Sequence, residues 1–134
     1  MDNNPTHHQC IVCIGSNYHK RENLAFARQK LSELFSTICF APEQETKPLY
    51  LKNQTLFSNQ VAVFFSEERE EEIIKILKEI EHAAGRQPGD KEEEKVCLDI
   101  DLLLYDNRIL KPEDWEREYV QQSLSTLHLP LCIK

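Results

Sequence analysis

The sequence predicts an α+β fold in which two helices cover one face of an antiparallel sheet. Its 134 residues are enough for one hydrophobic core, and the balance of 40% hydrophobic to 29% charged residues is typical of a globular domain. Segments with strand and helix periodicity follow one another in the order strand, helix, strand, strand, helix, strand. We therefore treat residues 1–134 as a single domain that begins with a flexible N-terminus over residues 1–9.

The first half of the chain provides a strand, a helix and a second strand. Residues 10–14 form an apolar run that ends at a Gly-Ser-Asn turn, as expected of a buried strand. A strand is also expected over residues 37–44, after which Pro48 ends regular pairing and a polar loop runs to Phe57. Between the two strands, from Glu22 onward, apolar residues recur at the spacing of a helix with one buried face. They are Leu24, Ala27, Leu31, Leu34 and Phe35.

The second half contains the remaining strand, helix and strand. Residues 59–65 alternate between two faces, as in a strand. Ser66 is expected to cap a helix that ends at Gly85, because two glutamates follow the serine and an apolar stripe of helical spacing follows them. Residues 96–105 form the last strand, and a short helical segment is expected over about residues 113–127. This βαββαβ order is the ferredoxin-like arrangement, here with a C-terminal helical extension.

Charge and hydropathy exclude several function classes. A net charge of −7 argues against a protein whose main task is to neutralise nucleic-acid phosphates or an anionic membrane. No apolar run approaches the roughly 20 residues that span a bilayer, and the polar start lacks the hydrophobic block of a secretory signal. We therefore expect a cytoplasmic protein that binds neither nucleic acid nor a membrane and needs no obligate protein partner.

The cysteines indicate packing rather than chemistry. There are five, an odd number, and most lie in apolar stretches, which favours reduced and buried thiols over a disulfide framework. Cys10 and Cys13 match the C-x-x-C pattern of metal and redox sites. Residues three apart on a strand point to opposite faces, so we favour a structural role for both thiols.

Two aspartates give the last strand a distinctive polar face. Alternation places Asp99 and Asp101 on the same side, with Cα atoms roughly 6.6 Å apart. A pair of carboxylates together with phosphate oxygens and water is the ligand set that Mg²⁺ prefers. A strand whose polar face meets solvent would show the same pattern, so the pair alone leaves both interpretations open.

Four segments together resemble the 6-hydroxymethyl-7,8-dihydropterin pyrophosphokinase family of folate biosynthesis. They are IGSN at 14–17, FSNQV at 57–61, IEHAAGR at 80–86 and LDIDL at 98–102, and they occur in the family's order and spacing. The resemblance runs from about Cys10 to Tyr105 and weakly on to Leu131. The family fold is the ferredoxin-like arrangement that the periodicities also predict.

The resemblance implies an ATP-dependent transferase. Family members move the terminal pyrophosphate of ATP to the hydroxymethyl group of 6-hydroxymethyl-7,8-dihydropterin and release AMP. Asp99 and Asp101 would hold two Mg²⁺ ions that come with ATP, and Arg86 would meet the triphosphate as a catalytic cation. An acidic protein would in this way bind ATP through metal ions.

Further site residues are carried over from the family motifs. Asn59 matches the asparagine that hydrogen-bonds the edge of the pterin, and a side-chain amide has the donor and the acceptor that this edge requires. The other positions that match pterin contacts are Thr46, Leu49, Phe57 and Tyr119, and those that match nucleotide contacts are Glu81, Lys95 and Arg117.

The chain departs from the family in the segment after the second helix. Residues 86–95 are mostly charged and contain Pro88 and Glu93 where the family has further arginines and a tryptophan that close over ATP. Val96 stands where the family has an arginine. The neighbouring Lys95 could replace the charge of that arginine but not its bidentate hydrogen bonding. Three hypotheses follow: an active diphosphokinase with a reduced lid, an impaired paralogue that binds a pterin without transferring pyrophosphate, and a ferredoxin-like interaction domain.

Overall fold

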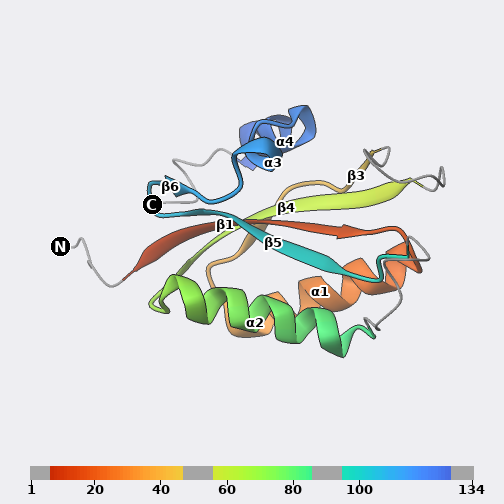
Figure 1. The fold of residues 1–134 in the computed structure, drawn as a ribbon, viewed down its shortest axis with the longest axis horizontal. Helices are drawn as coiled ribbons and strands as arrows, with labels where there is room; N and C mark the ends of the chain where they lie inside the picture. The colour runs from red at the N-terminus through yellow and green to blue at the C-terminus, as the bar shows by residue number, and fades with distance from the viewer. Residues whose placement is uncertain (1–6, 47–55, 86–94, 128–134) are drawn as a thin grey trace.

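The computed structural model describes residues 7–46, 56–85 and 95–127. In this part of the chain a six-stranded antiparallel sheet has the strand order β2-β4-β1-β5-β6, and β3 pairs with β4 beside β2. Helices α1 and α2 lie on one face of the sheet, and α3 and α4 lie on the other (Figure 1). The α+β class and the antiparallel sheet predicted from the sequence are therefore confirmed.

The bounds of the elements are as follows. The strands are β1 (His8–Ser16), β2 (Cys39–Phe40), β3 (Gln44–Thr46), β4 (Phe57–Ser66), β5 (Asp99–Tyr105) and β6 (Arg108–Ile109). The helices are α1 (Lys20–Leu34), α2 (Glu70–Ala83), α3 (Pro112–Trp115) and α4 (Glu118–Leu127). No helix of the described ranges is both long and apolar enough to cross a membrane.

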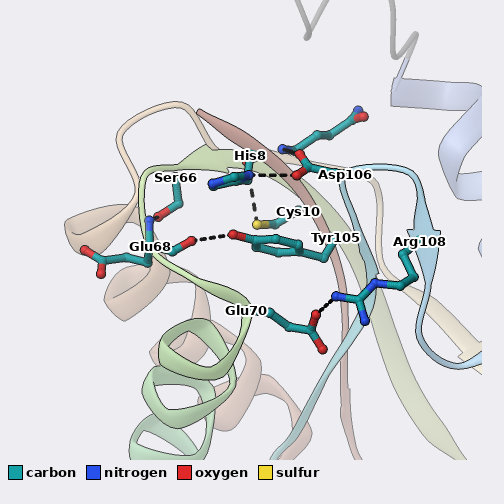
Figure 2. Close-up of polar contacts among 9 residues, drawn as sticks. His8, Cys10, Ser66, Glu68, Glu70, Tyr105, Asp106 and Arg108 are labelled. Atoms are coloured by element: carbon teal, nitrogen blue, oxygen red, sulfur yellow. Dashed lines mark hydrogen bonds and ion pairs between the residues drawn. The ribbon is translucent and has the colours of Figure 1, made fainter. Parts of the chain in front are cut away.

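The sheet begins earlier than predicted, because polar contacts fasten the start of β1 to the end of β5. His8, which we expected in the flexible N-terminus, is the first residue of β1. Its Nδ1 lies 2.7 Å from Oδ2 of Asp106, and the backbone N–H of Gln9 donates to Oδ1 of the same aspartate (Figure 2). The His8 ring also stacks on Tyr105, whose hydroxyl donates to the carbonyl of Glu68 at 2.7 Å.

The strand predicted over residues 37–44 is divided into two short strands. β2 and β3 both pair with β4, and the segment between them is held by the amide side chain of Gln60. This side chain donates to the Ala41 carbonyl at 2.8 Å and accepts from Arg28 at 3.0 Å. The predicted C-terminal helix is likewise divided, into α3 and α4.

Helix α2 begins four residues after Ser66. Arg69 occupies the N-cap position and makes no capping hydrogen bond with its side chain. The Ser66 hydroxyl instead accepts the N–H of Glu68 at 3.1 Å, so it stabilises the turn before the helix. The prediction that Ser66 caps the helix is therefore wrong. At the other end Gly85 has a φ of 102°, which is the left-handed conformation that favours glycine after a helix.

Both faces of the sheet are buried, which explains the continuous apolar runs in the central strands. One hydrophobic cluster lies under α1 and α2 and contains Cys10, Val12 and Phe64. The other lies under α4 and contains Cys13 and Val61. The two cysteines therefore point to opposite faces, as predicted.

Strand β5 changes face within its length. Ile100 and Leu102 pack in the cluster under α1 and α2, but Leu103 packs in the cluster under α4. The register of β1 with β5 shifts between Ile11 and Val12, which marks a β-bulge opposite these positions. Leu104, which alternation would place beside Leu102, consequently packs on the opposite face. The bulge lies after Asp101 and leaves the aspartate pair in regular register.

Candidate active site

Three residues from different parts of the chain form a row across the sheet. Gly15 in β1 is the register partner of Asn59 in β4 on one side and of Asp99 in β5 on the other. Neighbouring strands lie about 4.8 Å apart, so the Cα atoms of Asn59 and Asp99 are separated by roughly 10 Å. The predicted pterin residue and the predicted metal residue therefore lie on the same side of the sheet, within the length of one substrate.

Gly15 leaves space for the side chains beside it. A Cβ atom at this position would lie 3.1 Å from Oδ1 of Asn59 and 3.8 Å from the Phe57 ring. The first distance is shorter than an ordinary carbon-oxygen contact, so a larger residue would displace the amide. The absence of a side chain at Gly15 thus allows Asn59 and Phe57 to approach the middle of the sheet.

A hydrogen bond orients the Asn59 amide. Its Nδ2 donates to Oγ1 of Thr46 at 2.6 Å, and Thr46 belongs to β3, which pairs with the start of β4. Asn59 is only 6% exposed. Three of the residues predicted to bind the pterin, Thr46, Phe57 and Asn59, are therefore brought together. Leu49 lies outside the described residues.

The carboxyl group of Asp101 is partly buried beside that of Asp99. Burial and the neighbouring carboxylate of Asp99, with which Asp101 also shares a hydrogen bond, raise the pKa of Asp101 to about 7. Asp114 raises this pKa further, while the ammonium group of Lys111 opposes the rise. Two close carboxylates that share a proton are a site where a divalent cation would relieve the repulsion. The donor set therefore fits Mg²⁺ with further ligands from phosphate and water.

Glu81 supports the strand between the two aspartates. Its Oε2 accepts the backbone N–H of Ile100 at 2.7 Å, and the side chain is 7% exposed. Within the described ranges β6 pairs only with the last two residues of β5, so no strand lies beside the edge of β5 at Ile100. Glu81 satisfies an amide that this edge would otherwise leave without a partner. Sequence reasoning placed Glu81 near the nucleotide but did not identify this contact.

A groove of about 650 Å³ runs between α2 and this edge of β5. Its apolar lining includes Ile74, Leu77 and Leu102. Lys111, which sequence reasoning missed, lines the same groove together with both aspartates. A lysine next to a proline gives no sequence signal of a site, because only the fold brings it to β5. The groove is large enough for a small organic ligand and opens beside the carboxylates.

Tyr119 and Arg117 lie on the same side of the sheet as the aspartates. The Tyr119 hydroxyl and the Cys13 thiol are hydrogen-bonded at 3.4 Å, and Cys13 is the register partner of Asp101. Burial raises the pKa of both groups, that of Cys13 to about 12, so both stay protonated at neutral pH. The Arg117 guanidinium lies 4.6 Å from the centre of the Tyr119 ring. Arg117, which was predicted to contact the nucleotide, therefore covers one face of Tyr119, which was predicted to stack on the pterin.

The chain just before β5 is held by the loop after β1. Asn17 pairs with Val96 through two hydrogen bonds, from its N–H to the Val96 carbonyl at 2.9 Å and from the Val96 N–H to its side chain at 2.6 Å. The ammonium group of Lys95 lies 4.6 Å from the centre of the Tyr18 ring. Arg86, the predicted catalytic cation, lies outside the described residues, as do residues 87–94 of the charged segment.

Comparison with known proteins places this arrangement in context. A family model described as 7,8-dihydro-6-hydroxymethylpterin-pyrophosphokinase matches residues 11–129. "Folic acid synthesis protein FOL1" of Dictyostelium discoideum is 29% identical over 91 residues, which cover 62% of this chain and 14% of that protein. "Folate synthesis bifunctional protein, mitochondrial" of Arabidopsis thaliana is 27% identical over 133 residues, which cover 91% of this chain and 24% of that protein. The chain thus spans less than a quarter of the length of these curated relatives.

One solved structure has a weaker similarity. The C-terminal domain of the MgtC protein from Mycobacterium tuberculosis superposes with a TM-score of 0.40 and 9% identity, over 76% of this chain and 93% of that chain. A similarity of this size carries no information about function.

Proposed function

The chain belongs to the 7,8-dihydro-6-hydroxymethylpterin-pyrophosphokinase family, and we propose that it transfers pyrophosphate from ATP to 6-hydroxymethyl-7,8-dihydropterin, releasing AMP. In this reaction the substrate hydroxyl oxygen bonds to the β-phosphorus, and the bond from that phosphorus to the oxygen that bridges it to the α-phosphorus breaks. AMP leaves with this oxygen and its electron pair, and the hydroxyl proton is released to water. The observation that carries the proposal is the row of Asn59, Gly15 and Asp99, in which an amide suited to a heterocycle and a carboxylate suited to a metal ion lie on either side of the glycine.

The pterin would bind over Gly15. Asn59, held by Thr46, is suited to read the donor and acceptor edge of the ring, and Phe57 offers an apolar contact from the same strand. Tyr119 would contact the ring from the face opposite Arg117. With its edge at Asn59, the heterocycle would direct the hydroxymethyl arm towards β5 and thereby fix the attacking oxygen relative to the phosphates.

The nucleotide would bind at the open edge of β5. The apolar lining of the groove between α2 and β5 suits a nucleobase, and the two aspartates lie at the same groove. Asp99 and Asp101 would hold the Mg²⁺ ions, which when bound supply the positive charge that the phosphate oxygens require. Glu81 keeps the strand that bears both carboxylates in place. Arg86, Lys95 and Arg117 are proposed as further cations for the triphosphate, and Leu49 as a further pterin contact.

We make further proposals about the fold, the domain, the location and the partners of the protein. The strand order supports the ferredoxin-like arrangement, with α3 and α4 as its C-terminal extension. We also propose one domain over residues 1–134, a cytoplasmic location, no nucleic-acid or membrane ligand and no obligate protein partner.

A second candidate is a paralogue that binds a pterin without transferring pyrophosphate. Two features near the proposed nucleotide site favour it. Val96 stands where the family has an arginine, and the ammonium group of Lys95, which could replace that charge, lies against the Tyr18 ring. Calorimetry separates the candidates when it is combined with a turnover assay. An active enzyme binds the pterin in the presence of a non-hydrolysable ATP analogue and releases AMP with ATP, whereas the paralogue binds the pterin and releases no AMP. Asn59→Ala should weaken pterin binding about tenfold in both cases.

A further inference from the structure

The backbone of Lys111 is held by hydrogen bonds on both sides, while its side chain is half-exposed. The preceding residue, Leu110, donates its N–H to the carbonyl of Leu103 at 2.8 Å, and the Lys111 carbonyl accepts the N–H of Trp115 at 2.8 Å. The backbone is thus tied to β5 on one side and to α3 on the other. The side chain is 48% exposed, and its four rotatable bonds let the ammonium group move by several ångströms.

The ammonium group of Lys111 faces the acidic pair. Its Nζ lies 3.7 Å from Oδ1 of Asp101. Among the described residues, the charged groups that act on Asp101 are the anions Asp99 and Asp114 and the cation Lys111. Within the described residues, Lys111 therefore places a positive charge beside Asp101 that partly balances the acidic pair.

Lys111 also lines the groove between α2 and β5. A divalent cation bound by Asp99 and Asp101 would satisfy the carboxylates and repel the nearby ammonium group. The phosphates of a nucleotide bound beside the carboxylates would attract the same group. With both ligands bound, this side chain would have two anionic partners to choose between, the carboxylate and the phosphates.

We propose that Lys111 is the counter-ion of Asp101 in the metal-free protein and a phosphate-binding residue in the complex with MgATP. The proposal rests on the proposed function, because that function places metal and nucleotide at this groove. It makes two predictions of opposite sign. Lys111 should oppose the binding of a metal ion alone, with which it competes for the carboxylate, and it should favour the binding of MgATP.

The test is a pair of binding titrations on the full chain, carried out at one fixed pH and ionic strength for every variant. In Lys111→Met, Mn²⁺ alone should bind about two- to fivefold more tightly, the effect expected of a partly exposed ion pair. MgATP without pterin should bind about tenfold more weakly, as for a lost charged hydrogen bond. Lys111→Arg keeps the charge and should stay within about twofold of wild type in both titrations.

Lys75→Met is the matched control, because it removes one positive charge from an exposed site on α2 that does not line the groove. It should change neither affinity by more than about twofold. Unchanged or weaker Mn²⁺ binding in Lys111→Met would overturn the counter-ion role, and unchanged MgATP binding would overturn the phosphate role. Neither titration requires turnover, so a wild-type protein that binds both ligands but releases no AMP would contradict the proposed function and leave this inference standing.

Discussion

Asn59 and Asp99 are register partners of the same residue, Gly15, from opposite sides of β1. They are 40 positions apart in the sequence, and the strand order alone brings them within roughly 10 Å. A heterocycle held at Asn59 would therefore direct a short substituent towards the carboxylate pair. This relationship makes the glycine as important to the proposed reaction as the polar residues beside it.

Gly15→Ala should weaken pterin binding about tenfold or more. The new methyl group would lie 3.1 Å from Oδ1 of Asn59 and would displace the amide from its position against Thr46. MgATP binding should stay within about twofold of wild type, because the displaced side chain lies on the β4 side of the glycine. Calorimetry with each ligand measures both effects.

Gly85→Ala is the control for this substitution. A methyl group at Gly85 would meet no atom of the described residues within 4 Å, Asn59 included, but the φ of 102° means that alanine costs about 1 kcal/mol of backbone strain. The thermal stability of this variant should fall while its pterin affinity stays unchanged. Equal loss of pterin affinity in both glycine variants would contradict the role given to Gly15.

Asp101→Asn should lower turnover by orders of magnitude and yet stabilise the protein at alkaline pH. The pKa of Asp101 is raised to about 7 in the folded protein, so folding takes up a proton there between the unfolded pKa near 4 and this value. The free energy of unfolding contributed by Asp101 is therefore greatest below about pH 4 and is lost as the pH rises through 7.

An asparagine at position 101 can donate a hydrogen bond to Asp99 and carries no charge, so the variant should not lose free energy of unfolding as the pH rises through 7. Thermal unfolding of wild type and Asp101→Asn at pH 5.5 and pH 8.5 measures it. The variant should gain a few degrees at the higher pH, about what 1 kcal/mol gives in a domain of this size. A variant that is less stable than wild type at pH 8.5 would show that the carboxylate pair is not repulsive.

Glu81→Ala should lower the free energy of unfolding by about 1–3 kcal/mol, because it leaves the Ile100 N–H at the open edge of β5 without its acceptor. Glu81→Gln retains a carbonyl oxygen at the same place and should cost less than about 1 kcal/mol. Urea denaturation of the two variants distinguishes them. Equal losses would mean that the charge of Glu81, rather than its acceptor, supports the strand.

Asp106→Ala should lower the free energy of unfolding by about 2 kcal/mol without changing turnover. It removes the acceptors of His8 and of the Gln9 N–H, and it places alanine at a φ of 56° (Figure 2). Asp106→Asn tolerates this φ and keeps one acceptor, so it should lose less than half as much. A changed KM for ATP in either variant would show that this cluster, at the far end of β5 from Asp99, affects the site.

The sequence predicts the order of elements and the faces of the central strands because burial imposes period-two and helical patterns on them. Cys10 and Cys13 fall on opposite faces for this reason, and the same alternation places Asp99 and Asp101 together. The bulge that turns Leu104 away from the face of Leu102 breaks the pattern, and no local sequence signal indicates it.

Other features depend on contacts between distant segments. Gln60 holds the chain between β2 and β3, and a strand pattern over residues 37–44 contains no information about that side chain. A serine followed by two glutamates is typical of a helix cap, but the Ser66 hydroxyl accepts the N–H of Glu68, which precedes the helix. The partners of Glu81 and Lys111 both lie on β5, so their roles become visible only when the fold brings these segments together.

The release of AMP from ATP, measured with and without 6-hydroxymethyl-7,8-dihydropterin in the presence of Mg²⁺, tests the proposed reaction most directly. We predict release that requires both the pterin and the metal and that falls by orders of magnitude in Asp99→Asn and in Asp101→Asn. Wild-type protein that binds both substrates and forms no AMP, or variants that release AMP at the wild-type rate, would contradict it.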